Sequence, residues 1–347
     1  MTDLILVDEA VGETRACLFD ADGLPVELAI ERWSERASRL PEGSQVEGRV
    51  VRVDAGLNAA FVELPKGEDG FLPFGKKGRP KPVHEGAKIS VQVTREALAE
   101  KGPNLLYLQA GASDAKPLSL VERMYAPTDV DIAPARRDGR KRIDAAIEQA
   151  LAKLVRIEGG GNICIEQTRA LLAIDVDTGS SPITGGKFNY KAAHSAFRQL
   201  RLRSLGGIVV IDFAPMRTKN ERNALGAALD ALAKNDPARM DLLPLSRFGT
   251  LELLRRRTAR SPSEIILGRN GKKTTETVAL EALRGLENEA AAQGGAKLEI
   301  QAGLVLAEWL QADNIGWQTA MNDKIGPRFN ICPVDAFGRQ QWEVVAQ

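Results

Sequence analysis

The fold of this chain is decided by two apolar runs that each end in a carboxylate, LLAIDVD at residues 171–177 and GGIVVIDF at residues 206–213. Both runs are rich in β-branched residues and uncharged before the aspartate, a pattern typical of strands buried on both faces. Side chains alternate along a strand, so Asp175 and Asp177 point to one face, and Leu172, Ile174 and Val176 point to the other. If the two strands are neighbours, Asp212 joins this pair at one edge of the sheet.

Three carboxylates at one sheet edge predict a site for a hard cation. Burying a carboxylate is costly unless something neutralises it, and oxygen ligands suit Mg²⁺, with Mn²⁺ as the alternative ion, in phosphate chemistry. Single aspartates at strand ends also commonly cap the following turn, so that interpretation stays open for all three. A helical segment between the strands carries Arg198, which either reaches the carboxylates or is solvated.

Length and composition restrict the class of protein. The 347 residues exceed what one core usually supports, so two or three domains are expected. Lys+Arg number 47 against 46 for Asp+Glu, so a polyanionic partner would have to meet local patches of charge. Three widely spaced cysteines favour a reducing compartment over a disulfide framework. Without a secretory pattern or an apolar run of ~18 residues, we expect a cytoplasmic protein with no membrane partner.

Two β-rich regions precede the aspartates. Residues 1–42 alternate apolar runs with turns and predict a β meander packing on the catalytic part. Residues 43–111 contain five short β runs separated by glycines, which indicates an OB-fold barrel. Such barrels stack the bases of single-stranded nucleic acid on aromatic side chains beside basic ones. Phe61, Phe71 and Phe74 either do this or fill the barrel interior.

The remaining chain predicts two α/β units, so the fold class is α/β multidomain. Residues 112–262 form the catalytic domain, with three strands within 154–178, an amphipathic helix around 190–200 and a second helix at 221–235. At residues 246–257 we expect a turn at Gly249 followed by a basic helix. Residues 263–347 predict a small C-terminal α/β domain. The basic cluster at 136–142 either touches phosphates or is a solvated face.

Three blocks carry a family resemblance: residues 154–180, which include ALLAIDVDTGS, residues 198–216, which include RQLRLRSLGGIVVIDF, and residues 246–257, SRFGTLELLRRR. With the barrel inserted after an N-terminal meander, the chain resembles the ribonuclease E/G family of bacterial endoribonucleases. The resemblance implies metal-dependent cleavage of single-stranded RNA in RNA processing or decay. It also implies a barrel that clamps the substrate over a catalytic domain similar to DNase I.

The resemblance assigns roles to individual residues. The magnesium-binding, catalytic aspartates of the family match Asp175 and Asp212, and Asp177 would be a further metal ligand. The RNA-stacking aromatics match Phe61 and Phe71, and the basic RNA contact matches Lys101. Because a planar guanidinium grips two phosphate oxygens at once, we add two candidates for contact with the scissile phosphate: Arg198 and Arg247.

Four differences from the family describe a short form. Asp177 stands where the family has asparagine, and Pro215 stands where an acidic residue is common. The segment SPSEIILGRNGKKT, shortly after the SRFG block, contains no cysteine, so neither zinc nor a zinc-linked assembly is expected. The interval after the barrel is short and lacks the Arg-Thr pair that holds the 5′ phosphate of RNA, so sensing of that end is not expected.

The predicted function is that of a Mg²⁺-dependent endoribonuclease in which activated water attacks the phosphodiester. The resemblance implies products with 5′-phosphate and 3′-hydroxyl ends. The alternative is a non-catalytic RNA-binding protein that keeps the ribonuclease E/G fold. The sequence does not assign an oligomeric state.

Overall fold

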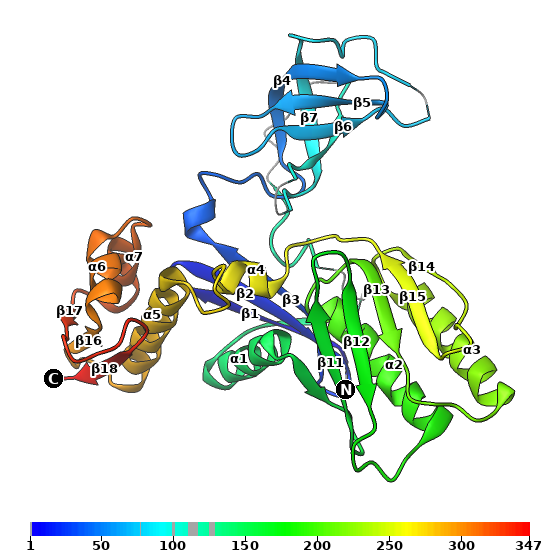
Figure 1. Cartoon of the computed structure of the whole chain (residues 1–347). Helices are drawn as coiled ribbons and strands as arrows, with labels where there is room; N and C mark the ends of the chain where they lie inside the picture. Colours follow the sequence, from blue (N-terminus) through cyan, green and yellow to red (C-terminus); the bar gives the residue numbers. More distant parts are fainter. Residues whose placement is uncertain (1, 77, 99–100, 110–116, 125–128) are drawn as a thin grey trace.

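The computed structural model (Figure 1) describes residues 2–76, 78–98, 101–109, 117–124 and 129–347. The chain begins with the predicted meander, in which three antiparallel strands pair in sequence order: β1 (Leu4–Ala10), β2 (Glu13–Phe19) and β3 (Pro25–Arg32). A one-turn helix, η1 (Trp33–Glu35), leads from this sheet towards the barrel.

The N-terminal sheet is completed by a later part of the chain. β9 (Asp131–Pro134) pairs in parallel with β1, and α1 (Arg137–Leu151) packs on the sheet through a shared apolar core. Residues 131–151 therefore belong with the meander. The predicted catalytic domain, residues 112–262, had placed them with the catalytic sheet instead. The reason is that β1 has a free edge for β9, while the apolar face of α1 covers the sheet. The predicted boundary itself lies outside the described residues.

The five predicted β runs form a closed barrel, consistent with an OB-fold, in the order β4-β5-β6-β8-β7. The strands are β4 (Gln45–Asp54), β5 (Ala59–Glu63), β6 (Gly70–Pro73), β7 (Lys88–Arg95) and β8 (Asn104–Tyr107). Alternate residues of each strand fill the interior, where Val50, Val62, Leu72 and Val91 are buried. Figure 1 shows the barrel standing apart from the rest of the chain.

A six-stranded mixed sheet follows, in the order β10-β11-β12-β13-β15-β14. Its strands are β10 (Leu154–Arg156), β11 (Asn162–Gln167), β12 (Leu172–Asp177), β13 (Gly207–Asp212), β14 (Met240–Leu242) and β15 (Thr250–Arg255). The helices α2 (Gly185–Leu202) and α3 (Lys219–Asn235) contribute apolar residues to its core, among them Phe188, Phe197, Leu225 and Leu229.

The other face of this sheet is open, which corrects the prediction of strands buried on both faces. In β12, Ile174 and Val176 are buried whereas Asp175 and Asp177 are exposed. In β13, Ile208 is 53% exposed. The sequence suggested burial on both faces because the open face also carries apolar residues. Ala173 and Val210 are examples, and both are only partly buried.

The region predicted as a basic helix is β15. Its burial alternates, with Leu251, Leu253 and Arg255 turned inward, and it pairs antiparallel with β13. Arg255 is buried because its guanidinium pairs with Asp236 at 3.0 Å. The run of arginines suggested a solvated helix. Arg255 is instead a buried residue of a strand, and Asp236 neutralises its charge.

The C-terminal unit is α/β, as predicted. After the short α4 (Pro262–Ile266), α5 (Thr275–Ala292) packs on a three-stranded sheet of order β17-β16-β18. Its other elements are β16 (Leu298–Ala302), α6 (Leu304–Ala312), α7 (Trp317–Ile325), β17 (Phe329–Pro333) and β18 (Trp342–Ala346). In the part of the chain that is described, no helix combines the length and apolar character needed to span a membrane.

Buried ion pairs join the N-terminal sheet to α1 and α5. Asp8 pairs with Arg15 at 2.6 Å and with Arg140 of α1 at 2.8 Å. Glu13 pairs with Arg32 and with Arg284 of α5, both at 2.8 Å. Within the basic cluster 136–142, Arg140 is therefore a structural residue.

Candidate active site and nucleic-acid interface

The two key aspartates lie directly beside each other. β12 and β13 are parallel neighbours, and their register pairs Asp175 with Asp212. Both side chains lie on the open face, and neither makes a hydrogen bond or ion pair to any other described residue. Neighbouring strands lie ~4.8 Å apart, and like charges placed directly opposite each other destabilise a sheet. The pair is thus an uncompensated negative site that a cation would relieve.

Asp177 is differently placed. It shares the open face with Asp175, as predicted. Its Oδ1 accepts a hydrogen bond from the Gly179 backbone N–H at 2.8 Å, so the carboxylate caps the turn that ends β12. Among the described residues, no group of three His, Cys, Asp or Glu side chains is arranged to hold a metal ion. The structure therefore brings together two of the three predicted ligands.

Two carboxylates nevertheless fit Mg²⁺. This ion keeps several waters and commonly binds proteins through one or two carboxylates together with substrate phosphates. Asp175 and Asp212 supply hard oxygen donors at an exposed edge, where water and a phosphodiester have access. Asp177 would act through water from its place in the turn.

The loop between β14 and β15, residues 243–249, lies beside Asp212 because Thr250, the first residue of β15, pairs with that aspartate. Arg247 is exposed on this loop, and its guanidinium carbon lies 5.4 Å from the centroid of the Phe248 ring. The predicted turn is present, and Gly249 adopts φ +95°, a conformation that favours glycine.

Phe248 was not among the predicted site residues, although its side chain is 81% exposed. Its position between Arg247 and a turn glycine was the available signal.

On the barrel, Phe61 and Phe71 lie outside the interior cluster, whereas Phe74 packs against it. The first two face each other across β5 and β6 with ring centroids 5.8 Å apart. The Arg52 guanidinium lies 4.5 Å from the Phe61 centroid. This half-buried pair beside a cation has the composition of a base-stacking surface, and neither ring belongs to the interior cluster.

Lys101 is exposed on the β7–β8 loop, which meets the Phe71 backbone two residues further on. The Phe71 backbone N–H donates to the Pro103 carbonyl at 2.8 Å. A Cβ at Gly102 would lie only 1.8 Å from the Asp69 carbonyl oxygen, so glycine is required for this close approach of the loop to β6.

Arg198 is not at the carboxylate site. It lies on α2, which packs against the covered face of the sheet, opposite Asp175 and Asp212. Burial lowers its pKa, and Asp20 of the β2–β3 turn partly offsets this effect. Arg198 falls beside the apolar stripe of α2, but that stripe faces the sheet, so the residue turns towards the N-terminal meander.

The histidines offer no general base at the carboxylates. His194 lies on α2 with its ring 4.5 Å from that of Tyr190, and burial together with Arg198 lowers its pKa. His84 lies in the barrel, where its ring contacts the Glu85 carbonyl.

The barrel joins the body at the far end of the sheet from the carboxylates. Arg95, at the end of β7, has a pKa lowered by burial and by repulsion from Arg256 and Arg257, which follow β15. Since β15 runs from Thr250 beside Asp212 to Arg255 beside Gly207, the barrel stem adjoins the end where β13 begins. At ~3.3 Å per residue, about 16 to 20 Å of strand separate the two ends.

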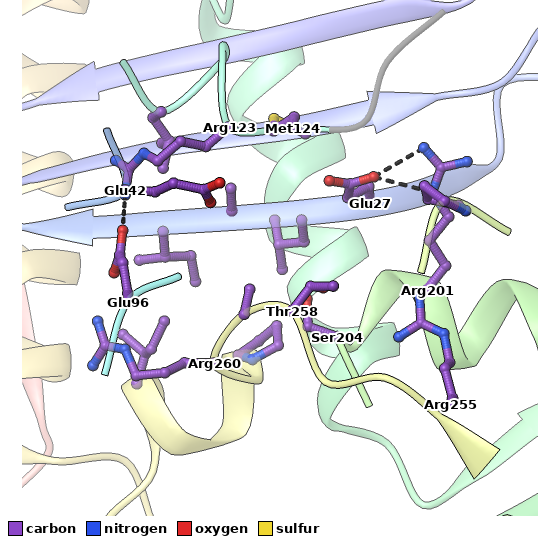
Figure 2. Close-up of a pocket in the computed structure, with 18 residues that line it drawn as sticks. Glu27, Glu42, Glu96, Arg123, Met124, Arg201, Ser204, Arg255, Thr258 and Arg260 are labelled. Atoms are coloured by element: carbon purple, nitrogen blue, oxygen red, sulfur yellow. Dashed lines mark hydrogen bonds and ion pairs between the residues drawn. The ribbon is translucent and has the colours of Figure 1, made fainter. Parts of the chain in front are cut away.

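A pocket at this junction is shown in Figure 2. Its walls come from β3, both connections to the barrel and the segment after β15. Its cations are already paired: Arg123 with Glu31 and Glu96, Arg260 with Glu35, Arg255 with Asp236 and Arg201 with Glu27. Burial, with repulsion from Glu96, raises the pKa of Glu42. The pocket is a structural joint rather than a ligand site.

The fold and the site together describe a class of protein in which an OB-type barrel with half-buried surface aromatics is joined to a sheet with paired carboxylates. Residues 75–258, just over half of the chain, match the sequence model of the Ribonuclease E/G family. The chain belongs to this family.

Its relatives are longer proteins. Over 218 residues it is 33% identical to Ribonuclease E of Escherichia coli (strain K12), covering 59% of this chain and 20% of that protein. It is 27% identical over 216 residues to Ribonuclease G of Salmonella typhimurium (strain SL1344), and 30% identical over 218 residues to Ribonuclease G of Haemophilus influenzae. Each of these two matches covers 58% of this chain and 44% of the relative, so the chain spans less than half of the proteins it matches.

Proposed function

We propose that this chain is a Mg²⁺-dependent endoribonuclease that hydrolyses phosphodiester bonds of single-stranded RNA, in RNA processing or decay. The observation that carries the proposal is the register pairing of Asp175 with Asp212, two exposed and uncompensated carboxylates within the family-matched region. The helix-covered mixed sheet supports a catalytic fold of the DNase I type, as the family resemblance implies.

In this proposal Asp175 and Asp212 hold the ion, while Asp177 keeps the turn after β12 in place. A bound Mg²⁺ supplies charge that stabilises the phosphodiester transition state and lowers the pKa of attacking water. Arg247, on the loop that leads into Thr250, contacts the scissile phosphate. Phe61, Phe71 and Lys101 hold a more distant part of the strand on the barrel.

A cleavage assay tests the proposal. A short single-stranded RNA is incubated with the parent protein and Mg²⁺, with EDTA, and with Asp175→Asn and Asp212→Asn. Of these four reactions, we expect cleavage only in the one with the parent and Mg²⁺, and the control variant Glu252→Gln should also cleave in Mg²⁺. Glu252→Gln is the matched control, because Glu252 is exposed on the same face and pairs with Val210. If Glu252→Gln also fails to cleave, the losses in the aspartate variants reflect the total negative charge on the open face of the sheet and not a specific role of the aspartates.

The second candidate is a non-catalytic RNA-binding protein. Two observations favour it: the described residues offer two paired metal ligands but no group of three, and the barrel joins the body at the opposite end of the sheet. Tight RNA binding by the parent with no metal-dependent cleavage would select this candidate.

We also propose that the protein acts in the cytoplasm. Cys17, Cys164 and Cys332 are free thiols, which suits a reducing cytoplasm. An assembly held by zinc is still not expected, and measuring the particle mass with and without a chelator tests this.

A further inference from the structure

We propose that the groove between α3 and residues 242–247, together with Phe248, binds the RNA nucleotides next to the cleaved bond. In this proposal the Phe248 ring stacks on a base, while Lys219 and Arg247 contact the phosphates. The inference rests on the proposed function for its substrate. It adds a second RNA-binding element that is separate from the barrel.

The loop that presents Phe248 is held in one conformation. Ser246 and Thr250 share a hydrogen bond between their hydroxyls at 2.7 Å, and the Ser246 N–H donates to the Thr250 carbonyl at 2.9 Å. Arg222 of α3 donates to the carbonyls of Ser246 and Arg247. A large aromatic ring is therefore kept in solvent on a well-supported loop, although burying it would be favourable. Such a ring suits a stacking partner that arrives from outside.

The groove has the size and charge for a nucleic-acid strand. Its volume is about 760 Å³, and its lining includes Lys219, Arg222 and Arg247, with Asp230 as the one acidic lining residue among those described. The opposite wall is apolar, formed by Leu242, Leu243 and Pro244. A basic rim beside apolar surface is the combination that binds the backbone and bases of single strands.

The groove opens at the carboxylate end of the sheet. α3 begins at Lys219, shortly after β13 ends at Asp212, and Thr250 links the loop to the same aspartate. Thr218 and Glu221 form a capping box that starts α3. The groove lies on the helix-covered side of the sheet, so a strand bound in it reaches the carboxylates around the loop at residues 243–249. The barrel stem lies at the other end of the sheet and is farther from them.

Gly226 supports the passage of a ligand along α3. It lies inside the helix and lines the groove, and a Cβ built there meets no atom within 4 Å. Glycine weakens a helix relative to alanine, and packing within the chain does not require it at this position. The missing side chain leaves the helix backbone open to close approach.

The experiment uses the full chain and a fluorescein-labelled single-stranded oligouridylate of about twelve nucleotides, with affinity measured by fluorescence anisotropy in EDTA so that no cleavage occurs. Phe248→Ala should weaken binding by about 5- to 150-fold, the range for loss of one stacked base, and Phe248→Trp should retain affinity. Gly226→Met should fill the groove and weaken binding without lowering the melting temperature, because it replaces glycine in a helix. Ile208→Ala, which removes an exposed apolar side chain from the same sheet, is the control and should bind as the parent does.

The outcomes separate this inference from the proposed function. Weaker binding by Phe248→Ala and Gly226→Met supports the groove even if the parent never cleaves RNA in Mg²⁺. Parent-like binding by both variants overturns it even if the parent cleaves. A change in the particle mass of Phe248→Ala at unchanged RNA affinity would identify the ring as a contact between copies of the chain, which also overturns it.

Discussion

Replacing Asp212 by asparagine should change stability in opposite directions with and without metal. Strand spacing places its carboxylate roughly 5 Å from that of Asp175. Two unit charges at that distance repel by about 1 kcal/mol in water and about 3 kcal/mol at an effective dielectric constant of 20. Because both groups are exposed, the value in water, about 1 kcal/mol, is the appropriate one. In EDTA, Asp212→Asn should therefore be more stable than the parent by that amount.

Magnesium reverses the order. A ligand at ten times its dissociation constant stabilises the folded protein by about 1.4 kcal/mol, which exceeds the repulsion. The parent gains this stabilisation, whereas Asp212→Asn has lost one of two ligands and gains little. With Mg²⁺, the parent should melt at the higher temperature.

Calorimetric melts of both proteins in EDTA and over a series of Mg²⁺ concentrations measure the effect, and they resolve the catalytic sheet from other units that melt separately. Glu252→Gln, on the same face, should respond to Mg²⁺ as the parent does. Equal Mg²⁺-induced shifts in the parent and in Asp212→Asn would refute the reasoning, as would a lower melting temperature for the variant in EDTA.

Three further results are expected. Phe71→Ala should weaken RNA binding by about 1 to 3 kcal/mol in an anisotropy titration with little change in the barrel melt, whereas Phe74→Ala should lower that melt because its ring packs on the interior. Arg198→Gln should cleave RNA within a few-fold of the parent rate in a single-turnover assay, since Arg198 lies on the face of the sheet opposite the aspartates. A rate reduced a hundredfold or more would show that Arg198 takes part in the active site. Arg284→Met should lower the free energy of unfolding by about 3 to 5 kcal/mol in urea titrations, because it leaves Glu13 with one arginine fewer.

The Glu13 carboxyl also gives a pH dependence. Burial raises its pKa, but Arg284 and Arg32 outweigh burial, so the folded value lies below the ordinary 4.5. A lowered pKa stabilises the folded protein above the unfolded value, and this contribution is lost as pH falls through the folded pKa. Urea titrations of the parent should therefore show a loss of stability below pH 4.5. Glu13→Gln should remove the part of this loss that belongs to Glu13; an unchanged pH profile in that variant would contradict the assignment.

Local patterns in the sequence predicted the meander and the barrel strands, because each rests on alternation and turn residues close together in the chain. They also predicted that Asp175 and Asp212 end two strands, whereas the pairing of those strands was only a condition and comes from the structure. The failures involve partners far apart in sequence. β15 was predicted as a helix because nothing near Arg255 shows that Asp236 neutralises it. β9 was assigned to the wrong unit because its partner, β1, lies more than a hundred residues earlier.

The site divides in the same way. The sequence indicated which face Asp177 occupies, but not that its oxygen is engaged by the turn at Gly179. Arg198 was misplaced because a position beside an apolar stripe does not show which neighbouring unit the helix leans against. Phe248 was missed because exposure of a ring depends on the loop that supports it.

The ion pairs of the N-terminal sheet have a consequence for biosynthesis. The Val11 N–H donates to Glu287 across a sequence separation of 276 residues, and Glu13 requires Arg284. At ~5 to 20 residues per second, a ribosome needs about 14 to 55 s to cover that separation. Until α5 emerges, Glu13 has Arg32 as a partner but lacks Arg284. The first sheet to be synthesised is thus among the last to be completed, and a nascent chain arrested before residue 284 should leave it open to proteases and chaperones.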